Sequence, residues 1–202
     1  MSAPNAASSL LKKSMDLVLA LSALIFFLPA FLLIALLVRL DSPGPALQWQ
    51  RHRGLNGKLF YICKFRTYSQ TAGRGYGGRL KGEGGRITPF GQFLRRSCLD
   101  EFPKLLNIIM GDMSIVGPRP HPLSDDQEFA ALLPNYNERF KASPGLTSLA
   151  QVRGYRGDIL SKEDLVRRLE CDLEYIENWS IGLDLMTICQ TLPVLFQQER
   201  AY

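Results

Sequence analysis

The most distinctive segment of the chain runs from Leu17 to Val38 and reads LVLALSALIFFLPAFLLIALLV. It contains no charged residue, and only Ser22 and Pro29 interrupt its apolar character. A straight helix of this length would cover the roughly 30 Å hydrocarbon core of a bilayer, so a transmembrane span is one interpretation. A cleaved signal peptide fits poorly, because the apolar stretch exceeds the usual length of about 7–15 residues and no A-x-A cleavage site follows.

A second interpretation is a helical hairpin that enters and leaves the membrane on the same side. Pro29 removes a main-chain hydrogen bond to the carbonyl of Ile25 and predicts a kink, which leaves two halves that are each too short to cross. Positive charge flanks both ends of the segment, at Lys12, Lys13, Arg39, Arg51 and Arg53. This distribution favours keeping both ends in the cytoplasm. The sequence favours the hairpin and leaves the straight span open.

The rest of the chain has the composition of a globular protein. The 202 residues are 46% hydrophobic and 21% charged, which suits one domain or a domain with an anchor and excludes a disordered chain. Residues 51–96 hold eleven lysines and arginines against a single acid, Glu83. Such a basic segment close to an apolar one indicates phosphate partners, from lipid headgroups, nucleotides or nucleic acid. The four cysteines lack C-x-x-C spacing, so we expect them to be reduced and structural, with Cys98 the candidate for reactivity.

Local patterns predict a mostly helical α+β protein. Short strands are expected at 46–49 and 59–63, and a flexible basic loop at 69–86. Helices are expected at 88–96, 97–110, 127–141 and 162–179. The apolar segment 181–196 reads equally as core or as an amphipathic helix lying in the membrane interface. We therefore expect a membrane-embedded helix-break-helix over 1–45 and a small cytosolic, membrane-associated catalytic domain over 46–202.

The adjacent acids Asp100 and Glu101 are the strongest candidates for chemistry. Ser97-x-x-Asp100 also matches the pattern of a helix cap, and this purely structural interpretation stays open. A carboxylate in the first turn of a helix is kept ionised by the helix dipole, and an ionised carboxylate is a competent nucleophile toward phosphorus. Adjacent helical side chains diverge by roughly 100°, so the two acids should not share one proton. One acid is suited to attack, and the other to hold a metal ion against substrate phosphates.

An acid that reacts with a phosphate needs cations nearby to offset the repulsion, and arginine binds phosphate through two hydrogen bonds. Candidates are Lys64, Arg66, Arg95, Arg119, Arg153 and Arg156. Taken singly, each is better explained as a solvated surface charge, except Arg119, whose backbone is restricted by Pro118 and Pro120 before anything binds. The histidines His52 and His121 lack metal-ligand spacing, and we expect His121 at the surface or at a helix start.

Several blocks of the sequence, in order, resemble the bacterial sugar transferase family, the monotopic phosphoglycosyl transferases that begin bacterial glycan assembly. The blocks are Lys64-Phe-Arg-Thr67, Ile87-Thr-Pro-Phe-Gly91, Leu99-Asp-Glu-Phe-Pro103, Gly111-Asp-Met-Ser-Ile-Val-Gly-Pro-Arg-Pro-His121, Pro144-Gly-Leu-Thr147, Ala150-Gln-Val152 and Asp172-Leu-Glu-Tyr-Ile-Glu-Asn-Trp-Ser180. They cover nearly the whole chain, and the most specific part runs from Leu99 to His121. Two departures stand out: Ser148-Leu149 replaces the usual Gly-Trp, and the N-terminal extension of larger members is missing, so we expect the minimal catalytic form.

The resemblance implies a re-entrant N-terminal helix at the cytoplasmic face of the bacterial inner membrane, in contact with phospholipid. It also implies a two-step reaction that needs Mg²⁺. Asp100 would attack the β-phosphate of a UDP-sugar, expel UMP and hold the sugar phosphate, which a polyprenyl phosphate, usually undecaprenyl phosphate, would then accept. Glu101 would bind Mg²⁺, and the cations that contact phosphate would be Lys64, Arg95, Arg119 and Arg156. UDP-glucose or UDP-galactose is the favoured donor, nucleic acid is not expected as a partner, and a homodimer is left open.

Two other functions stay open from the residues alone. A membrane phosphatase or hydrolase would use the same carboxylates with water as acceptor, and it would release free sugar phosphate. A membrane-tethered adaptor for anionic lipid or nucleic acid would explain the basic segment, and its binding would weaken uniformly with salt. The adaptor gives no role to Asp100 and Glu101 between Arg95 and Arg119.

Overall fold

The computed structural model describes residues 9–69, 86–157 and 159–196, so the basic loop predicted at 69–86 lies almost entirely outside the described residues. The described part is mostly helical with short strands, as the α+β prediction requires. The helices are α1 (Leu10–Phe26), α2 (Leu28–Asp41), α3 (Pro89–Arg96), α4 (Lys104–Ile109), α5 (Leu123–Leu132), α6 (Leu149–Val152), α7 (Lys162–Glu177) and α8 (Ile181–Phe196). The strands are β1 (Leu47–Arg53), β2 (Leu59–Phe65), β3 (Ser114–Val116) and β4 (Gly145–Thr147). Turns of 3₁₀ helix cover Leu55–Gly57, Leu99–Glu101 and Tyr136–Lys141.

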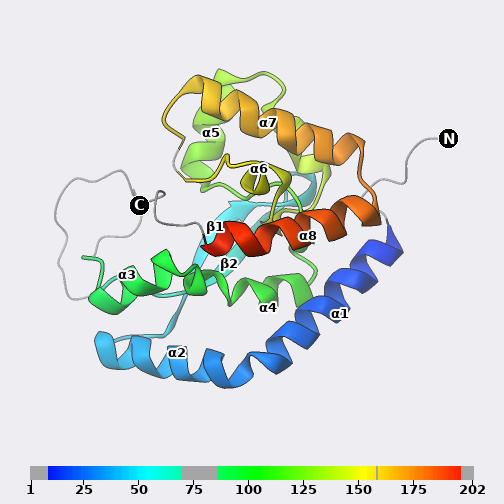
Figure 1. Ribbon diagram of the computed structural model, residues 1–202. Coiled ribbons are helices and arrows are strands. Elements are labelled where there is room, and N and C mark those ends of the chain that lie inside the picture. Colours follow the sequence, from blue (N-terminus) through cyan, green and yellow to red (C-terminus); the bar gives the residue numbers. More distant parts are fainter. Residues whose placement is uncertain (1–8, 70–85, 158, 197–202) are drawn as a thin grey trace.

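The N-terminal apolar segment forms a bent pair of helices. α1 and α2 meet at Phe27 with a bend of 65°, and they lie along one side of the molecule (Figure 1). The kink predicted from Pro29 is confirmed by this bend. Pro29 stands in the first turn of α2, where the N–H groups have no partner within the helix, so its missing N–H is tolerated there. Among the described residues no single helix is long and apolar enough to cross a membrane, whereas the bent pair together meets that requirement by length and composition.

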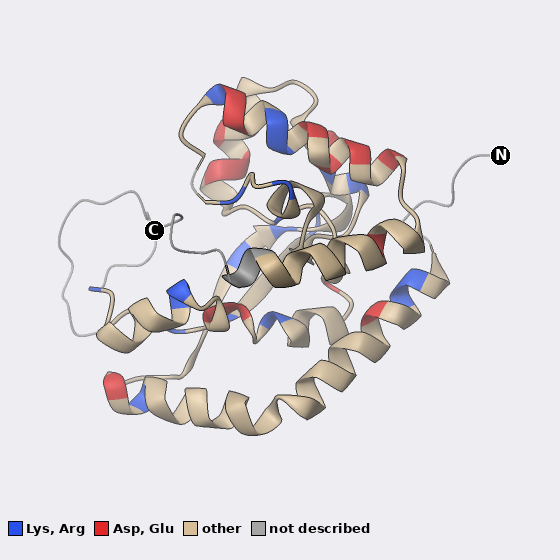
Figure 2. Cartoon of the chain, in the orientation of Figure 1, with Lys and Arg blue, Asp and Glu red and all other residues tan. Residues whose placement is uncertain are grey.

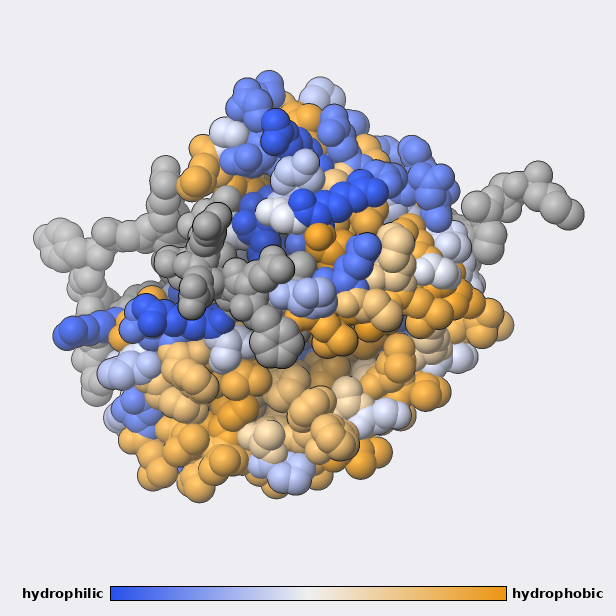
Figure 3. Space-filling model, viewed as in Figure 1, coloured by the Kyte–Doolittle hydropathy of each residue, from blue (hydrophilic) through white to orange (hydrophobic). Residues whose placement is uncertain are grey.

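The outer face of this helix pair is apolar and exposed. Its large exposed side chains include Leu17, Val18, Leu21, Ile25, Phe26, Leu32, Leu33 and Leu36. Hydrophobic residues gather over α1 and α2 at the bottom of the view, while hydrophilic residues gather over α5 and α7 at the top (Figure 3). Charged residues of the pair are confined to the start of α1 and the end of α2 (Figure 2). An exposed apolar surface of this extent marks contact with a membrane or with another protein.

A buried polar network holds α1 against the rest of the domain. The ammonium group of Lys12 lies 2.8 Å from the carboxylate of Asp184 in α8, and both side chains are almost fully buried. Asp184 also accepts hydrogen bonds from the Tyr175 hydroxyl at 2.8 Å and from the Trp179 indole at 3.1 Å. α8 buries Asp184 on one side and exposes apolar side chains on the other, so this segment contributes to the core as one alternative predicted, and its position in a membrane interface stays a prediction. The exposed residues are Leu185, Met186 and Leu192.

Strands β1 and β2 form an antiparallel hairpin, and the short helix α4 packs against β2. The side chain of Asn107 in α4 accepts a hydrogen bond from the N–H of Cys63 at 2.9 Å and donates one to the carbonyl of Tyr61 at 2.6 Å. These two bonds satisfy the free edge of β2 and fix the distance between α4 and this strand. As a result, α4 lies beside the strand that carries Lys64.

The second sheet pairs β3 with β4 in parallel, across a pair of glycines. A β-carbon on Gly145 would lie 2.2 Å from the main-chain nitrogen of Gly117, so the two backbones can approach this closely only without side chains. The N–H of Gly145 donates to the carbonyl of Pro118 at 3.0 Å. The segment from Gly117 to Pro120, predicted to be stiff and extended, is therefore held against the start of β4.

The replacement of Gly-Trp by Ser148-Leu149 is accommodated locally. Leu149 is buried in the core cluster that contains Val116, Tyr175 and Trp179. The hydroxyl of Ser148 accepts a hydrogen bond from the N–H of Gln151 and thereby caps α6. Ser148 therefore caps α6, and Leu149 packs α6 against the core.

The helix predicted over 97–110 is wrong. Cys98 adopts a left-handed backbone conformation with φ of 55°, which an α-helix does not continue, so a 3₁₀ turn and the short α4 replace one long helix. Ser97 ends α3, and its hydroxyl donates to main-chain carbonyls within that helix. The interpretation of Ser97-x-x-Asp100 as a helix cap is therefore also wrong.

Other predicted bounds differ in smaller ways. The helix expected over 127–141 is divided into α5 and a 3₁₀ turn, because Pro134 lies between them and cannot continue α5. Strands β1 and β2 are longer than predicted, and the pairing of β3 with β4 was not foreseen. The division of the chain at residue 45 stays a prediction, although α2 contributes Ile34 and Val38 to a core cluster with Phe65.

Replacing Lys12 with methionine should lower the free energy of unfolding by roughly 3–5 kcal/mol, because Asp184 would then be a buried charge without its cation. The measurement is denaturant unfolding in detergent, followed by tryptophan fluorescence. Lys13→Met is the matched control, since the neighbouring lysine is exposed. Equal stability of the two variants would show that the Lys12–Asp184 pair does not hold α1 in place.

Candidate active site

The two adjacent acids occupy the corner between α3 and α4. The left-handed Cys98 turns the chain, and the 3₁₀ turn Leu99–Glu101 follows before α4 begins at Lys104. Both acids therefore precede α4, which has only six residues, so the expected first turn of a long helix does not exist here. The environment of each carboxylate must come from side chains that other elements bring to this corner.

Glu101 is held by two cations. Its Oε1 atom lies 2.9 Å from the ammonium group of Lys104 and 3.0 Å from the guanidinium of Arg119. Burial alone would raise the pKa of Glu101, but the charges of Arg119, Lys104 and Lys64 hold that pKa well below its usual value. Among the described residues no hydrogen bond reaches its Oε2. Glu101 is thus a firmly ionised carboxylate with one oxygen already bound.

Asp100 differs from its neighbour in both contacts and pKa. Burial and the charge of Glu101 raise the pKa of Asp100, and the charges of Lys64, Lys104 and Arg95 offset this only in part. The structure records no hydrogen bond or ion pair for this carboxylate within the described part of the chain. Adjacent acids whose surroundings move their pKa values apart are suited to different tasks. Of the two acids, Asp100 is the one whose carboxylate has no recorded partner in the described part of the chain.

Lys104 is a site residue that the sequence analysis missed. Its side chain is only 2% exposed and its ammonium group contacts Glu101, three residues earlier. Burial and the charges of Lys64 and Arg119 lower the pKa of Lys104 to about 8, although the charge of Glu101 acts in the opposite direction. A signal was present in the sequence, because Lys104 is the single charged residue from Phe102 to Ile109, at the spacing that pairs with Glu101.

Three of the predicted cations converge on the acid pair. Lys64 extends from β2, and its charge acts on both acids. Arg95, at the end of α3, donates to the Thr67 hydroxyl at 3.1 Å and lies 4.5 Å from the ring centre of Tyr68, while its charge acts on Asp100. With Arg119, these residues bring β2, α3 and the segment after β3 to one place.

Arg156 lies close by, against the residue that turns the chain. Its guanidinium is 2.6 Å from the Sγ of Cys98, two residues before Asp100. Arg153, named only as a candidate, forms an ion pair with Glu174 at the surface. The reactivity proposed for Cys98 stays a prediction.

Arg66 does not belong to this group. Its guanidinium donates hydrogen bonds to the carbonyls of Val38, Ser42 and Pro43, at 3.2, 2.5 and 2.5 Å. These carbonyls lie in the last turn of α2 and directly after it, so Arg66 caps this helix end and joins the bent helix pair to the end of β2. We therefore remove Arg66 from the predicted phosphate-binding residues.

Both histidines are buried, so the surface position considered for His121 is wrong, whereas the helix start offered as the alternative agrees with its place two residues before α5. The Nδ1 of His52 lies 2.6 Å from the carbonyl of His121, and the Nδ1 of His121 lies 2.7 Å from the Tyr136 hydroxyl. Burial and the nearby cations lower the pKa of His52 to about 3, and for the same reasons that of His121 lies well below its usual value. Both rings are neutral near pH 7 and serve as hydrogen-bonding groups.

Comparison with known proteins gives consistent relatives. A UDP-glucose:undecaprenyl-phosphate glucose-1-phosphate transferase of Caulobacter vibrioides is 42% identical over 98% of this chain and 74% of that protein. The transferase of the same name from Escherichia coli K12 is 38% identical over 96% of this chain and 42% of that protein. A UDP-N-acetylgalactosamine-undecaprenyl-phosphate N-acetylgalactosaminephosphotransferase of Aeromonas hydrophila is 34% identical over 95% and 45%, respectively. The chain thus spans less than half of the last two relatives.

The profile of one family, described as bacterial sugar transferase, matches residues 7–198. That range includes the bent helix pair, the acid pair and every cation assigned to the site. With this match and a relative that is 42% identical over nearly the whole chain, the protein belongs to the bacterial sugar transferase family.

Proposed function

We propose that this chain transfers a sugar 1-phosphate from a UDP-sugar to undecaprenyl phosphate at the cytoplasmic face of the bacterial inner membrane. The observation that carries the proposal is the contrast within one turn: Glu101 is fixed by Lys104 and Arg119, while Asp100 is held by no ion pair among the described residues. Three of the relatives named as glucose-1-phosphate transferases are 38–42% identical to the chain, which makes UDP-glucose the first donor to test. UDP-galactose remains the second candidate from the sequence.

In the first step, a carboxylate oxygen of Asp100 forms a bond to the β-phosphorus of the UDP-sugar. The bond from that phosphorus to the oxygen bridging the two phosphates breaks, and UMP leaves with the electron pair. In the second step, an oxygen of undecaprenyl phosphate attacks the same phosphorus. The bond to Asp100 breaks, which regenerates the carboxylate and releases undecaprenyl diphosphate sugar.

The cations around Asp100 match the charge that this reaction must stabilise. A diphosphate would approach a carboxylate whose neighbour, Glu101, is also ionised, so unscreened repulsion would oppose attack. Lys64, Arg95 and Arg119 come from three different elements and surround the acids, and Arg156 lies on the Cys98 side of the turn. Fixed cations of this kind stabilise developing charge without having to reorganise during the reaction.

The donor set also fits a magnesium ion, with Glu101 as the protein ligand. The described residues contain no group of three or more His, Cys, Asp or Glu side chains that could hold a metal by themselves. Mg²⁺ does not require such a group, because it is often bound by one or two carboxylates together with substrate phosphates and water. Both cations contact Oε1 of Glu101, which leaves Oε2 for a metal. When bound, Mg²⁺ would neutralise charge on the diphosphate.

A membrane location is supported by the exposed apolar face of α1 and α2. The pair bends by 65° instead of continuing straight, and Lys12 and Arg39 mark its two ends. This arrangement favours a re-entrant, monotopic attachment with both ends on the cytoplasmic side. A lipid acceptor anchored in the bilayer could then reach an acid pair that is held close to the same helices through α4.

The two alternative functions remain distinguishable by experiment. A hydrolase with the same acid pair would release sugar phosphate without undecaprenyl phosphate. A lipid-binding adaptor would bind membranes unchanged after Asp100→Asn. The precise contacts of Glu101 with Lys104 and Arg119 favour an enzyme over an adaptor, because surface attraction to lipid requires no buried acid pair.

Incubation of the purified protein with labelled UDP-glucose, without acceptor, should give a labelled protein, since the first step leaves the sugar phosphate on Asp100. Asp100→Asn should abolish the label, and Glu128→Gln, which changes an exposed carboxylate, should retain it. Adding undecaprenyl phosphate should discharge the label into lipid. Parallel reactions with UDP-galactose and UDP-N-acetylgalactosamine identify the donor. Lipid-dependent turnover without any labelled protein would rule out the two-step scheme.

Removal of divalent cations with EDTA should abolish transfer, and Mg²⁺ should restore it, because the diphosphate charge would otherwise be neutralised only in part. In Glu101→Gln, the Mg²⁺ concentration for half-maximal rate should rise at least tenfold. The same variant should also lose metal-dependent protection against thermal unfolding in the presence of UDP. Unchanged Mg²⁺ dependence in this variant would remove Glu101 as the metal ligand.

Lys104→Gln should lower kcat by about 10- to 100-fold, since a buried hydrogen bond to a charged group contributes roughly 1.5–3 kcal/mol. Lys104→Arg should retain more activity, because it keeps a cation beside Glu101. Lys58→Gln, an exposed lysine in the turn of the hairpin, is the control. Circular dichroism establishes that each variant is folded. Full activity of Lys104→Gln would exclude Lys104 from the site.

A further inference from the structure

The segment from Gly117 to His121 carries Arg119 to the acid pair, and its position depends on its carbonyl groups. Pro118 and Pro120 have no N–H, so they cannot donate hydrogen bonds to hold the segment in place. The side chain of Arg119 is itself 30% exposed, and a long exposed side chain loses conformational freedom when it is fixed. The hydrogen bonds of Gly117 and of the Pro118 carbonyl to β4 hold the start of the segment, and the carbonyl of Arg119 offers a second point at which the backbone can be fixed.

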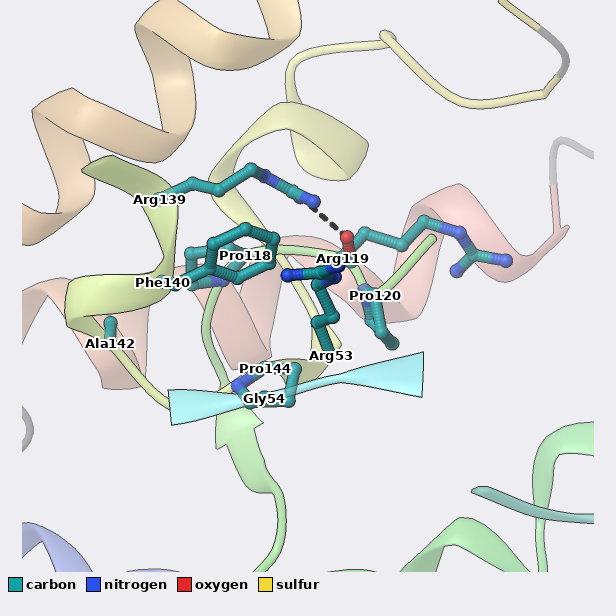
Figure 4. Close-up of a pocket in the computed structure, with 9 residues that line it drawn as sticks. All are labelled: Arg53, Gly54, Pro118, Arg119, Pro120, Arg139, Phe140, Ala142 and Pro144. Atoms are coloured by element: carbon teal, nitrogen blue, oxygen red, sulfur yellow. Dashed lines mark hydrogen bonds between the residues drawn. The ribbon is translucent and has the colours of Figure 1, made fainter. Parts of the chain in front are cut away.

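A buried arginine supplies that support from the opposite side. Arg139 lies in the 3₁₀ turn Tyr136–Lys141, and its side chain is only 3% exposed. Its Nη2 donates a hydrogen bond to the carbonyl of Arg119 at 2.5 Å. Figure 4 shows this bond and shows that the side chain of Arg119 extends away from Arg139. Arg139 therefore fixes the backbone of Arg119, whose side chain contacts Glu101.

Arg139 is in turn fixed by its own partners. Its Nε and Nη2 donate to Oδ2 of Asp172 in α7, at 3.0 and 2.8 Å. Its Nη1 donates to the Tyr136 hydroxyl at 3.0 Å, and that hydroxyl donates to Asp126 in α5 at 2.6 Å. The three nitrogens of one planar group thus donate to acceptors in its own turn, in α7 and in the segment after β3, which a lysine ammonium could not reproduce.

We infer that Arg139 is a positioning residue that acts on the transfer reaction through Arg119. The inference rests on the proposed function, because it assigns Arg139 a part in that same reaction. Asp172 anchors the guanidinium of Arg139, the guanidinium holds the carbonyl of Arg119, and the side chain of Arg119 reaches Oε1 of Glu101. The polar network between α5, α7 and the segment after β3 therefore sets the geometry of the acid pair, although Arg139 itself lies on the side of the Arg119 backbone away from Glu101.

The network also explains why the site needs α7, which contributes no side chain to the acid pair. Asp172 belongs to the block of residues that the sequence analysis singled out in α7 without assigning a role. Its carboxylate is buried and binds Arg139. A buried ion pair is costly to form unless its remaining donors are also satisfied, and here one of those donors is used on the Arg119 carbonyl.

A double-mutant cycle tests the inference, with Arg139→Lys, Arg119→Ala and the combined variant. The assay is the initial rate of labelled glucose phosphate transfer from UDP-glucose to undecaprenyl phosphate. In the natural background, Arg139→Lys should lower kcat/KM about tenfold or more. In the Arg119→Ala background, the same change should lower kcat/KM less than about twofold, because the residue through which Arg139 acts is already missing. Arg167→Lys, an exposed arginine of α7, is the matched control.

A purely structural role would give a different result. Equal losses in both backgrounds, or a loss that follows only the melting temperature, would overturn the inference. If Arg139→Lys does not fold, Asp172→Asn replaces it in the same cycle, since the amide keeps the size of the side chain and weakens its hold on Arg139. Absence of transfer by the unaltered protein would instead refute the proposed function, so the two failures are distinguishable.

Discussion

The contact of one carboxylate oxygen with two cations holds the site together. Oε1 of Glu101 is bound by Lys104, from the helix that follows it, and by Arg119, from a segment eighteen residues away in sequence. A buried carboxylate is unfavourable without such partners, so this contact fixes the corner between α3 and α4 against the segment after β3. Asp100 is carried on the same corner, and its position is therefore determined by contacts that its neighbour makes.

This division of labour explains how two identical functional groups one residue apart behave differently. Glu101 is stabilised as an anion by direct contacts, whereas Asp100 is influenced by the same cations without a direct pair among the described residues. A carboxylate that is not already bound retains its oxygens for a substrate. The left-handed conformation of Cys98 is the local strain that permits this arrangement, because it breaks the helix just before the acids.

The apolar helix pair is connected to the rest of the domain, including the strand beside the acid pair, by buried polar contacts. Arg66, which directly follows the strand that carries Lys64, binds carbonyls at the end of α2, and Lys12 pairs with Asp184 in α8. Both connections are polar contacts in positions shielded from water, where an unpaired group is costly. A displacement of α1 or α2 would consequently be transmitted to β2, which carries Lys64, and to α8.

The sequence by itself determined the bend just before Pro29, the mostly helical α+β class and the acid pair with most of its cations. These features depend on local chemistry: a proline without an N–H, an apolar run of fixed length, and charged residues in recognisable blocks. Only the tertiary structure decided that Arg66 supports α2, that Lys104 contacts Glu101, that Cys98 ends the predicted helix and that His121 is buried. The physical reason is that burial and hydrogen-bond partners depend on which distant segments meet. The sequence specifies the charge of a side chain, but it does not specify which carbonyl or carboxylate that side chain will contact.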